Sequence, residues 1–287
     1  MWMEITTGIG CTNNCTFCPQ STFIKSYFKK CGKNAPRLLS YQNFLKILRN
    51  VPQNVGLGFS GFCEPFQNSE CTEMVLAGIE KGFDITIYTT LMGLSQENVE
   101  RILAKFPLKS DNPKITIHVP SIDRIEAIRT TPEYYKTLET LLSSGVQPIE
   151  FHYHGSKPVE KVKNMIEAAG YKVEFAGQMS RAGNLKSRQV PVINRRKGAL
   201  TCKIMNERGH VILPDGTVLL CCMDYGMKHI LGNILKSSYD SLHSSKEWQL
   251  ILKGCRDENL KTICRCCDLA KSVETNIIKK LWSYLYE

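Results

Sequence analysis

Short runs of apolar and β-branched residues alternate with longer amphipathic segments over the first two thirds of the chain. The runs typical of strands lie at 4–7, 55–59, 85–89, 115–119, 149–153 and 173–175. Between them, apolar residues recur at helical spacing over 41–48, 71–81, 96–105, 132–142 and 159–169. Because parallel neighbours need a helix-length return, this alternation predicts a parallel sheet. Six strands are too few for the usual closed eight-strand barrel, which leaves a doubly wound sheet or an incomplete barrel.

The pattern changes after residue 175. Gly, Ser, Arg and Asn dominate 177–198, and 209–220 has the pattern of a hairpin with its turn at 214–217. Near the end of the chain, 277–285 shows apolar residues at helical spacing, which is typical of a packing face. We therefore expect two domains, at 1–190 and 191–287.

The composition narrows the classes of protein. Hydrophobic residues make up 43% of the chain and charged residues 22%, so neither the disordered nor the membrane class fits. No apolar run reaches about 18 residues and no basic leader precedes the first strand, so we expect a cytoplasmic protein without a membrane partner. The net charge of +10 indicates an anionic partner of some kind, but no zinc-finger or RNP pattern accompanies it, and we do not expect nucleic acid.

Many of the thirteen cysteines lie in two groups, one near each end of the chain. In a reducing compartment such groups are more often metal ligands than disulfides. Cys11, Cys15 and Cys18 directly follow the first strand with the spacing C-x3-C-x2-C. Loops at the carboxyl ends of parallel strands are where such sheets place their chemistry. Three thiolates leave a coordination position open, whereas a structural zinc or an electron-transfer cluster is closed by four.

This spacing, with an aromatic residue at Phe17, resembles the signature of the radical S-adenosylmethionine (radical SAM) superfamily. The resemblance implies an incomplete (β/α)6 TIM-like barrel and a [4Fe-4S] cluster on Cys11, Cys15 and Cys18. It implies further that the fourth iron binds the amino and carboxylate groups of S-adenosylmethionine. One-electron reduction then yields methionine and a 5′-deoxyadenosyl radical. The alternative is a zinc knuckle that takes a fourth ligand such as Cys31.

The resemblance also implies residues that contact S-adenosylmethionine at the ends of successive strands. The segment 59–65 resembles the turn that holds the amino group, with Glu64 as the acidic residue and Cys63 where a second glycine is usual. A buried carboxylate facing an ammonium group is a sound pairing, because each neutralises the other out of water. Glu64 as a solvated charge at a helix start and His118 as a core histidine are the structural alternatives. The full set of expected cofactor-binding residues is Phe17, Glu64, Thr89, Thr90, His118, Ser121 and Arg181.

The second group of cysteines resembles the C-terminal SPASM extension of radical SAM enzymes in its shortened, twitch form. Cys202, Gly216 and Cys221 follow the pattern C-x13-G-x4-C, and Cys264 and Cys267 form C-x2-C. No cysteine follows Cys267, so the resemblance implies one auxiliary [4Fe-4S] cluster on Cys202, Cys221, Cys264 and Cys267. A zinc ribbon is the alternative.

Two further cysteines are neighbours of these ligands, and either Cys222 or Cys266 could replace Cys221 or Cys267. Cys222 is also a candidate catalytic residue, because a cysteine in related epimerases gives a hydrogen atom to a carbon radical. We expect epimerisation if this thiol donates, and oxidation if the auxiliary cluster accepts the substrate electron.

The expected function is therefore that of a radical SAM oxidoreductase or epimerase in natural product biosynthesis. Its substrate is a carbohydrate-like metabolite or a peptide, and its electron donor a protein such as flavodoxin or ferredoxin. Because the first strand begins near Met1, we expect no separate peptide-recognition domain, which favours the small metabolite. A non-catalytic iron–sulfur or zinc-binding protein and an electron-transfer protein remain as alternatives.

Overall fold

The computed structural model describes residues 1–107, 114–185, 190 and 193–273. One large sheet runs through it, with the strand order β10-β9-β8-β1-β2-β3-β4-β5-β6. Strands β1 to β6 pair in parallel in chain order, β8 joins β1 in parallel, and β9 and β10 add antiparallel neighbours. The strands are β1 (Trp2–Ile5), β2 (Gly56–Phe59), β3 (Ile85–Thr89), β4 (Ile115–His118), β5 (Ile149–Tyr153), β6 (Val173–Phe175), β8 (His210–Ile212), β9 (Thr217–Leu219) and β10 (Ile230–Asn233).

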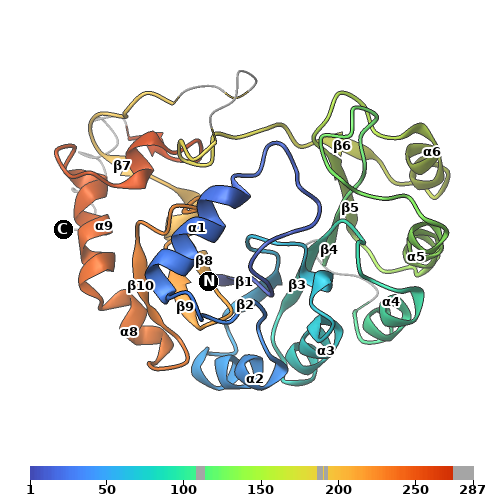
Figure 1. Cartoon of the computed structure of the whole chain (residues 1–287), viewed down its shortest axis with the longest axis horizontal. Helices are drawn as coiled ribbons and strands as arrows, with labels where there is room; N and C mark the ends of the chain where they lie inside the picture. Colours follow the sequence, from blue (N-terminus) through green and yellow to red (C-terminus); the bar gives the residue numbers. More distant parts are fainter. Residues whose placement is uncertain (108–113, 186–189, 191–192, 274–287) are drawn as a thin grey trace, which may run out of the picture.

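Helices follow the parallel strands and lie on the outer side of the curved sheet (Figure 1). The helices are α1 (Gln20–Cys31), α2 (Tyr41–Asn50), α3 (Cys71–Glu80), α4 (Gln96–Leu103), α5 (Pro132–Ser143), α6 (Glu160–Ala168), α7 (Lys203–Asn206), α8 (Tyr239–His243) and α9 (Lys246–Arg256). The order of β1 to β6 never reverses, so this part of the sheet has none of the switch points that define a doubly wound fold. The predicted α/β architecture of an incomplete (β/α)6 barrel is confirmed.

Alternation along the strands separates an apolar outer face from a polar inner face. Met3 and Ile5 of β1 are fully buried in the core beneath the helices. The residue between them, Glu4, lies on the inner face, where its charge raises the pKa of Tyr88 on β3. Tyr88 also interacts with Thr116 on β4 and with Glu150 on β5. Side chains from β1, β3, β4 and β5 therefore meet on the inner face.

Two glycines of β2 let an aromatic residue lie flat on that face. A Cβ added at Gly58 would stand 2.4 Å from Cζ2 of Trp2, and one at Gly56 would stand 2.5 Å from its Cε3. These distances are shorter than van der Waals contact, so the indole occupies space that only glycine leaves free. The pattern G-x-G at 56–58 thus serves packing inside a strand.

The cysteine-rich region, 199–273, extends the sheet beyond β1 through β8, β9 and β10. It also contains the 3₁₀ turn η2 (Ile263–Cys266) and a small antiparallel sheet of β7 (Leu200–Thr201) and β11 (Lys271–Ser272). A second 3₁₀ turn, η1 (Pro65–Gln67), lies elsewhere, after β2. The hairpin expected at 209–220 is formed by β8 and β9. Since β8 to β10 extend the barrel sheet, the division at residue 190 stays a prediction.

The first strand begins two residues earlier than expected, and α1, β10, α8 and α9 lie where no element was predicted. The apolar pattern at 277–285 lies outside the described residues. Within the described ranges, no helix is long and apolar enough to cross a membrane.

Candidate active site

The loop that carries Cys11, Cys15 and Cys18 lies between β1 and α1, at the carboxyl end of the parallel strands. Backbone hydrogen bonds join it to the loop that follows β4: the Thr16 amide donates to the Ile125 carbonyl at 2.8 Å, and the Ala127 amide to the Asn13 carbonyl at 2.6 Å. The Asn13 side chain also donates to the Thr90 hydroxyl after β3 at 2.8 Å. The loop is therefore held across three strand ends.

The three front thiols lie close enough to affect one another. Burial raises the pKa of Cys15, and the neighbouring Cys18 and Cys11 raise it further. Burial likewise raises the pKa of Cys11. A bound cation favours the thiolate forms of Cys11 and Cys15, since it neutralises their charge. Cys31, the fourth ligand of the zinc alternative, instead lies 3.7 Å from the hydroxyl of Thr217 on β9.

Glu64, at the start of η1, is a buried carboxylate, 4% exposed, with both oxygens held. Its Oε1 accepts from the Thr89 hydroxyl at 2.7 Å, and its Oε2 accepts from the Thr90 amide at 2.6 Å and the Thr90 hydroxyl at 2.7 Å. Burial raises the pKa of Glu64, and these hydrogen bonds oppose that shift. The predicted residues Glu64, Thr89 and Thr90 thus form one cluster, next to the Cys11 loop.

Ser121 and Phe17, also predicted, make other contacts. Ser121 is buried and donates to Oε2 of Glu126 at 2.6 Å, while Oε1 of Glu126 has no hydrogen-bond partner among the described residues. Glu126 lies near Cys15, whose pKa it raises. The Phe17 ring packs on His154, with 4.3 Å between the ring centroids.

His118 and His154 form a hydrogen-bonded pair whose tautomers follow from their partners. The Gly177 carbonyl lies 2.7 Å from Nδ1 of His154, so that nitrogen carries the proton. Burial lowers the pKa of His154, and burial lowers that of His118 to about 3, so both rings are neutral. Nε2 of His154 then accepts from Nδ1 of His118 at 3.1 Å, which leaves Nε2 of His118 as an unprotonated acceptor.

Arg181 follows β6 and lies close to Tyr225, Cys222, Cys18 and Glu4. Its Nε is buried with no acceptor among the residues that the structure describes. The Tyr225 hydroxyl is 3.5 Å from the Cys18 sulfur. Arg181 is thus a cation beside the front cysteines with donors to spare, which suits an anionic group of a bound molecule.

Cys222, the candidate hydrogen-atom donor, lies beside Glu4 on the inner face of the sheet. Burial raises the pKa of Glu4, although Cys222, the Ser60 hydroxyl and the Gly61 amide all donate to its carboxylate. The last two donors lie 3.1 and 3.2 Å from Oε2. The structure therefore brings Cys222 and Arg181 together with the front cysteines.

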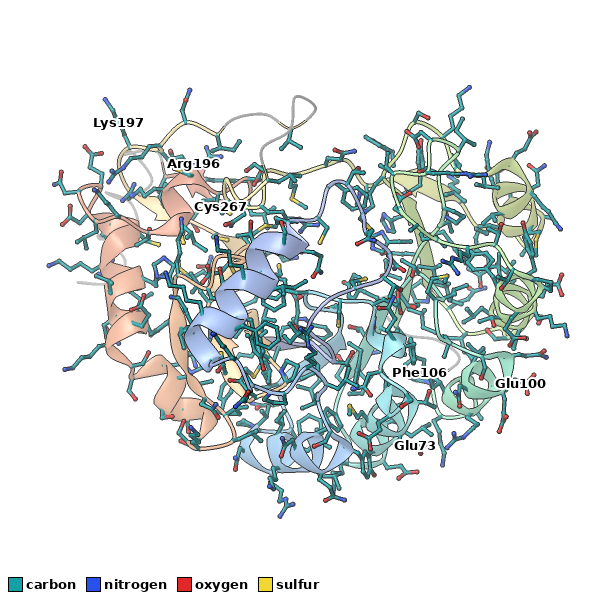
Figure 2. The ribbon with its side chains drawn as sticks, viewed as in Figure 1. Glu73, Glu100, Phe106, Arg196, Lys197 and Cys267 are labelled. Carbon is teal, nitrogen blue, oxygen red and sulfur yellow. The ribbon has the colours of Figure 1, made fainter. Side chains whose placement is uncertain are left out.

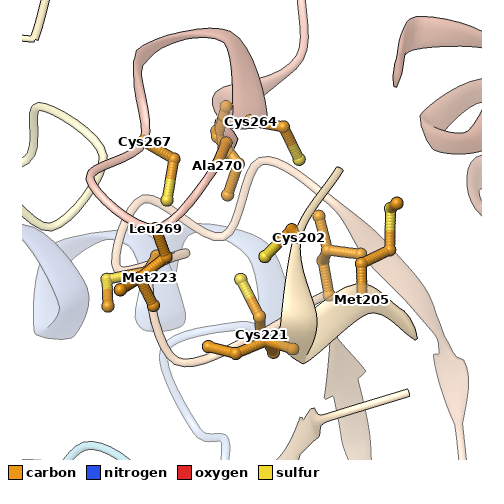
Figure 3. A pocket seen from close by; sticks show the side chains of 11 residues that line it. Cys202, Met205, Cys221, Met223, Cys264, Cys267, Leu269 and Ala270 are labelled. Carbon is orange, nitrogen blue, oxygen red and sulfur yellow. The ribbon is translucent and has the colours of Figure 1, made fainter. Parts of the chain in front are cut away.

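The four predicted auxiliary ligands line a single cavity. Figure 3 shows the side chains of Cys202, Cys221, Cys264 and Cys267 lining one pocket together with apolar side chains. Burial raises the pKa of Cys221 and of Cys267. Cys222 and Cys266 do not line this cavity, which supports Cys221 and Cys267 as the ligands.

A single zinc ion and an iron–sulfur cluster place different demands on the positions of their thiolate ligands. Zinc draws its ligands to about 2.0–2.3 Å of one point. Within 1–107, 114–185, 190 and 193–273, no group of three or more His, Cys, Asp or Glu side chains is arranged to hold one metal ion. In a [4Fe-4S] cluster each thiolate binds a different iron, so the sulfurs stand further apart. A cluster therefore does not require the thiols to converge on one point.

A buried arginine supplies a second test of the auxiliary site. Arg265, in η2 between Cys264 and Cys266, is 1% exposed and donates to the carbonyls of Gly198, Arg196 and Gly254. In the described part of the chain it has no carboxylate partner. A buried cation needs a counter-charge, and four thiolates around a dipositive iron–sulfur core carry a net negative charge. Arg265 therefore fits a cluster in this cavity.

Sequence reasoning missed Glu4, Glu126, Tyr225 and Asp268. Glu4 had a signal, since it is the charged residue between two apolar ones in the first strand. Asp268 directly follows Cys267, and its carboxylate accepts from Ser180 across the chain. Tyr225 and Glu126 come from irregular loops and carried no sequence signal.

Residues 202–268 match the SPASM family, an iron–sulfur cluster-binding domain. Comparison with curated protein sequences gives no match.

Solved structures resemble nearly the whole chain. Two of them are BtrN in complex with AdoMet (S-adenosylmethionine) and 2-DOIA, and anSMEcpe with bound AdoMet. BtrN is 13% identical with a TM-score of 0.57, covering 95% of this chain and 93% of BtrN. For anSMEcpe the identity is 13% and the TM-score 0.57, covering 93% of this chain and 86% of that one. Streptococcus suis SuiB bound to its precursor peptide SuiA is 14% identical with a TM-score of 0.62, covering 97% of this chain and 72% of SuiB.

At these identities the likeness shows a shared fold. Together with the SPASM match, it confirms the predicted resemblance to radical SAM enzymes that carry a SPASM-type domain.

Proposed function

We propose that this chain is an enzyme that cleaves S-adenosylmethionine reductively and abstracts a hydrogen atom from a C–H bond of a small polar metabolite. The proposal rests on one observation: three groups of side chains lie together at the carboxyl ends of the strands. They are the three front thiols, the buried carboxylate of Glu64 and the cationic side chain of Arg181. A [4Fe-4S] cluster on Cys11, Cys15 and Cys18, when bound, supplies the electron that splits the sulfonium group. A second cluster on Cys202, Cys221, Cys264 and Cys267 is the proposed auxiliary site.

The protein's own residues hold the two polar ends of the amino acid portion of S-adenosylmethionine. Glu64, oriented by Thr89 and Thr90, faces the ammonium group. Arg181, whose Nε has no acceptor within the described ranges, faces the carboxylate. Opposite charges that pair out of water fix the orientation of the bound molecule. AdoMet is bound in the structures of BtrN and anSMEcpe that share this fold.

The inner face of the sheet supports a substrate rich in hydroxyl or amino groups. Trp2 and Tyr88 offer flat apolar surfaces. Glu4 and Nε2 of His118 offer acceptors, and Tyr88 is 43% exposed. Aromatic surfaces combined with buried acceptors suit a carbohydrate-like metabolite. A peptide, as in the SuiB–SuiA structure, is the second candidate substrate.

Among the reaction outcomes, the position of Cys222 favours epimerisation. In that reaction the thiol gives its hydrogen atom to the substrate radical, so that a C–H bond forms and a thiyl radical remains. One electron and one proton then restore the thiol. Glu4 lies beside Cys222 to return the proton, and the electron comes from an external donor such as flavodoxin or ferredoxin. Oxidation, with the electron leaving the substrate instead, is the competing outcome.

The test is the formation of 5′-deoxyadenosine by anaerobically reconstituted protein with S-adenosylmethionine and dithionite, followed by mass spectrometry. We expect the wild type to form it and Cys15→Ala to form none. Cys31→Ala is the matched control, because Cys31 ends α1 and its sulfur lies 3.7 Å from the Thr217 hydroxyl on β9, and it should retain the activity. Protein that holds zinc and no iron, or that holds iron and forms no 5′-deoxyadenosine, contradicts the proposal.

A further inference from the structure

The loop at 264–268, which contains Cys264 and Cys267, is hydrogen-bonded to the turn at 180–184 that follows β6. Oδ1 of Asp268 accepts from the Ser180 amide at 2.8 Å, and its Oδ2 accepts from the Ser180 hydroxyl at 2.7 Å and the Ala182 amide at 3.2 Å. Both carboxylate oxygens are therefore committed to a turn 88 residues away in the chain. Asp268 directly follows Cys267, so the same loop lines the auxiliary cavity.

The turn that Asp268 contacts has an unfavourable backbone conformation, although hydrogen bonds within it join Leu185 to Ser180 and Asn184 to Arg181. Arg181, Ala182 and Gly183 have φ angles of +52°, +54° and +76°, and only glycine adopts this region without steric cost. Two adjacent non-glycine residues in this conformation persist only when contacts from elsewhere impose it. Within the turn, the Gly183 amide donates to the Ser180 hydroxyl at 3.2 Å, so Asp268 also positions this internal bond.

A second contact from the cysteine-rich region holds the far side of the turn. The Asn184 side chain donates to the Arg181 carbonyl at 2.7 Å and to the Met223 carbonyl at 3.2 Å. Met223 also lines the auxiliary cavity. The loop that carries Cys267 has a further contact, because Arg196 donates to the Cys267 carbonyl at 3.4 Å; Figure 2 labels both residues. The turn thus rests on two loops that both reach the auxiliary site.

The conformation of the turn directs Arg181 toward Cys18, Cys222 and Glu4. We propose that Asp268 is a positioning residue that couples the auxiliary cysteine loop to Arg181. When that loop is ordered by its cluster, Asp268 imposes the left-handed turn, and Arg181 faces the carboxylate of S-adenosylmethionine. Assembly of the auxiliary site and binding of S-adenosylmethionine at the front site therefore favour each other. The assignment of the ligand rests on the proposed function, but the grip of Asp268 on the turn does not.

Hydrogen exchange and S-adenosylmethionine binding together test the coupling in the reconstituted full chain. Asp268→Ala removes all three hydrogen bonds. We expect amide exchange in peptides covering 177–185 to become at least about tenfold faster, because exchange reports local opening. We expect the affinity for S-adenosylmethionine, measured by calorimetry, to fall by about tenfold or more, as for the loss of one charged hydrogen bond. The matched control is Asp240→Asn, an exposed carboxylate on α8, which should change neither quantity.

Asp268 directly follows Cys267, so Asp268→Ala also changes the loop that carries this proposed ligand. A second variant tests the coupling without changing that loop. Ser180→Ala leaves the 264–268 loop intact and removes the hydroxyl that donates to Oδ2 of Asp268 and accepts from the Gly183 amide, so it should retain full iron content. It should speed exchange at 177–185 and weaken binding in the same direction, by about threefold to tenfold.

The proposal is overturned if exchange at 177–185 is unchanged in either variant, or if exchange rises while the affinity for S-adenosylmethionine does not fall. If the wild type binds no S-adenosylmethionine, the proposed function fails instead, and the exchange measurement still decides whether Asp268 holds the turn.

Discussion

Replacing Glu64 by glutamine separates the role of its charge from the role of its shape. Oε2 accepts two short hydrogen bonds from Thr90, one of them from a backbone amide that cannot reverse its direction. Oε1 accepts from the Thr89 hydroxyl at 2.7 Å and from the Phe66 amide at 3.4 Å. The glutamine NH2 group therefore takes the Oε1 position, where the Thr89 hydroxyl can rotate to accept from it.

The expected effect on stability is small and the expected effect on binding is large. Glu64→Gln loses the longest hydrogen bond and keeps the rest, so we expect the free energy of unfolding to change by no more than about 1 kcal/mol. The ammonium group of S-adenosylmethionine, however, loses its anionic partner. A hydrogen bond to a charged group contributes about 1.5–3 kcal/mol, so affinity should fall by about 10-fold to 150-fold.

Titration calorimetry with the reconstituted protein measures the affinity, and urea denaturation measures the stability. Glu73→Gln is the matched control: Glu73 lies on the outer helix α3 (Figure 2), its side chain is 51% exposed, and it pairs with Arg101 at 2.7 Å. Exposed pairs contribute about 0–1 kcal/mol, and the affinity of this variant should equal that of the wild type. If Glu64→Gln binds S-adenosylmethionine as tightly as the wild type, Glu64 does not face the ammonium group.

A pH series gives a second check on the same residue. Burial raises the pKa of Glu64 in the folded chain above its ordinary value of 4.5. The folded state therefore binds the proton more tightly than the unfolded state does. The resulting stabilisation is complete below about pH 4.5 and is lost as the pH rises through the raised pKa. Over that window the ligand-free wild type should lose stability relative to Glu64→Gln, and a constant difference would contradict the assigned shift.

Three further predictions concern the other parts of the site. Cys264→Ser should lower the iron content by about half, with the front cluster retained, and full retention of iron would exclude Cys264 as a ligand. Cys222→Ala should still form 5′-deoxyadenosine, but once a substrate is identified, its product made in D2O should lack the solvent deuterium that a thiol donor delivers; normal product would exclude the donor role. Gly58→Ala places a carbon 2.4 Å from the Trp2 ring, and overpacking should cost about 1–3 kcal/mol in urea denaturation; Gly8→Ala, with its nearest contact at 3.4 Å, should cost less, and equal costs would contradict the packing argument.

The strands and the cysteine ligands could be predicted because each leaves a local pattern in the sequence. Buried parallel strands are apolar runs, and thiolates around one cluster follow fixed spacings in loops. Glu64 could be placed by its position after the second strand. In each case neighbouring residues carry the information.

The remaining contacts depend on chain segments that only folding brings together. Asp268 meets Ser180 across 88 residues, and Tyr225 meets Cys18 across 207. Helix α1 lacks a side-chain cap and begins after Pro19, so its start carried no signal beyond the cysteine motif. The tautomers of His118 and His154 follow from the carbonyl of Gly177, which no side-chain pattern reveals.

The central claim is that the cluster on Cys11, Cys15 and Cys18 keeps one iron open for S-adenosylmethionine. Electron–nuclear double resonance of the reduced protein tests it with S-adenosylmethionine labelled with ¹⁵N in the amino group and ¹³C in the carboxylate. We predict hyperfine coupling of both labels to the front cluster in the wild type and in Cys222→Ala. A spectrum that is unchanged by the labelled compound, with the fourth iron held by a protein side chain, would contradict the account.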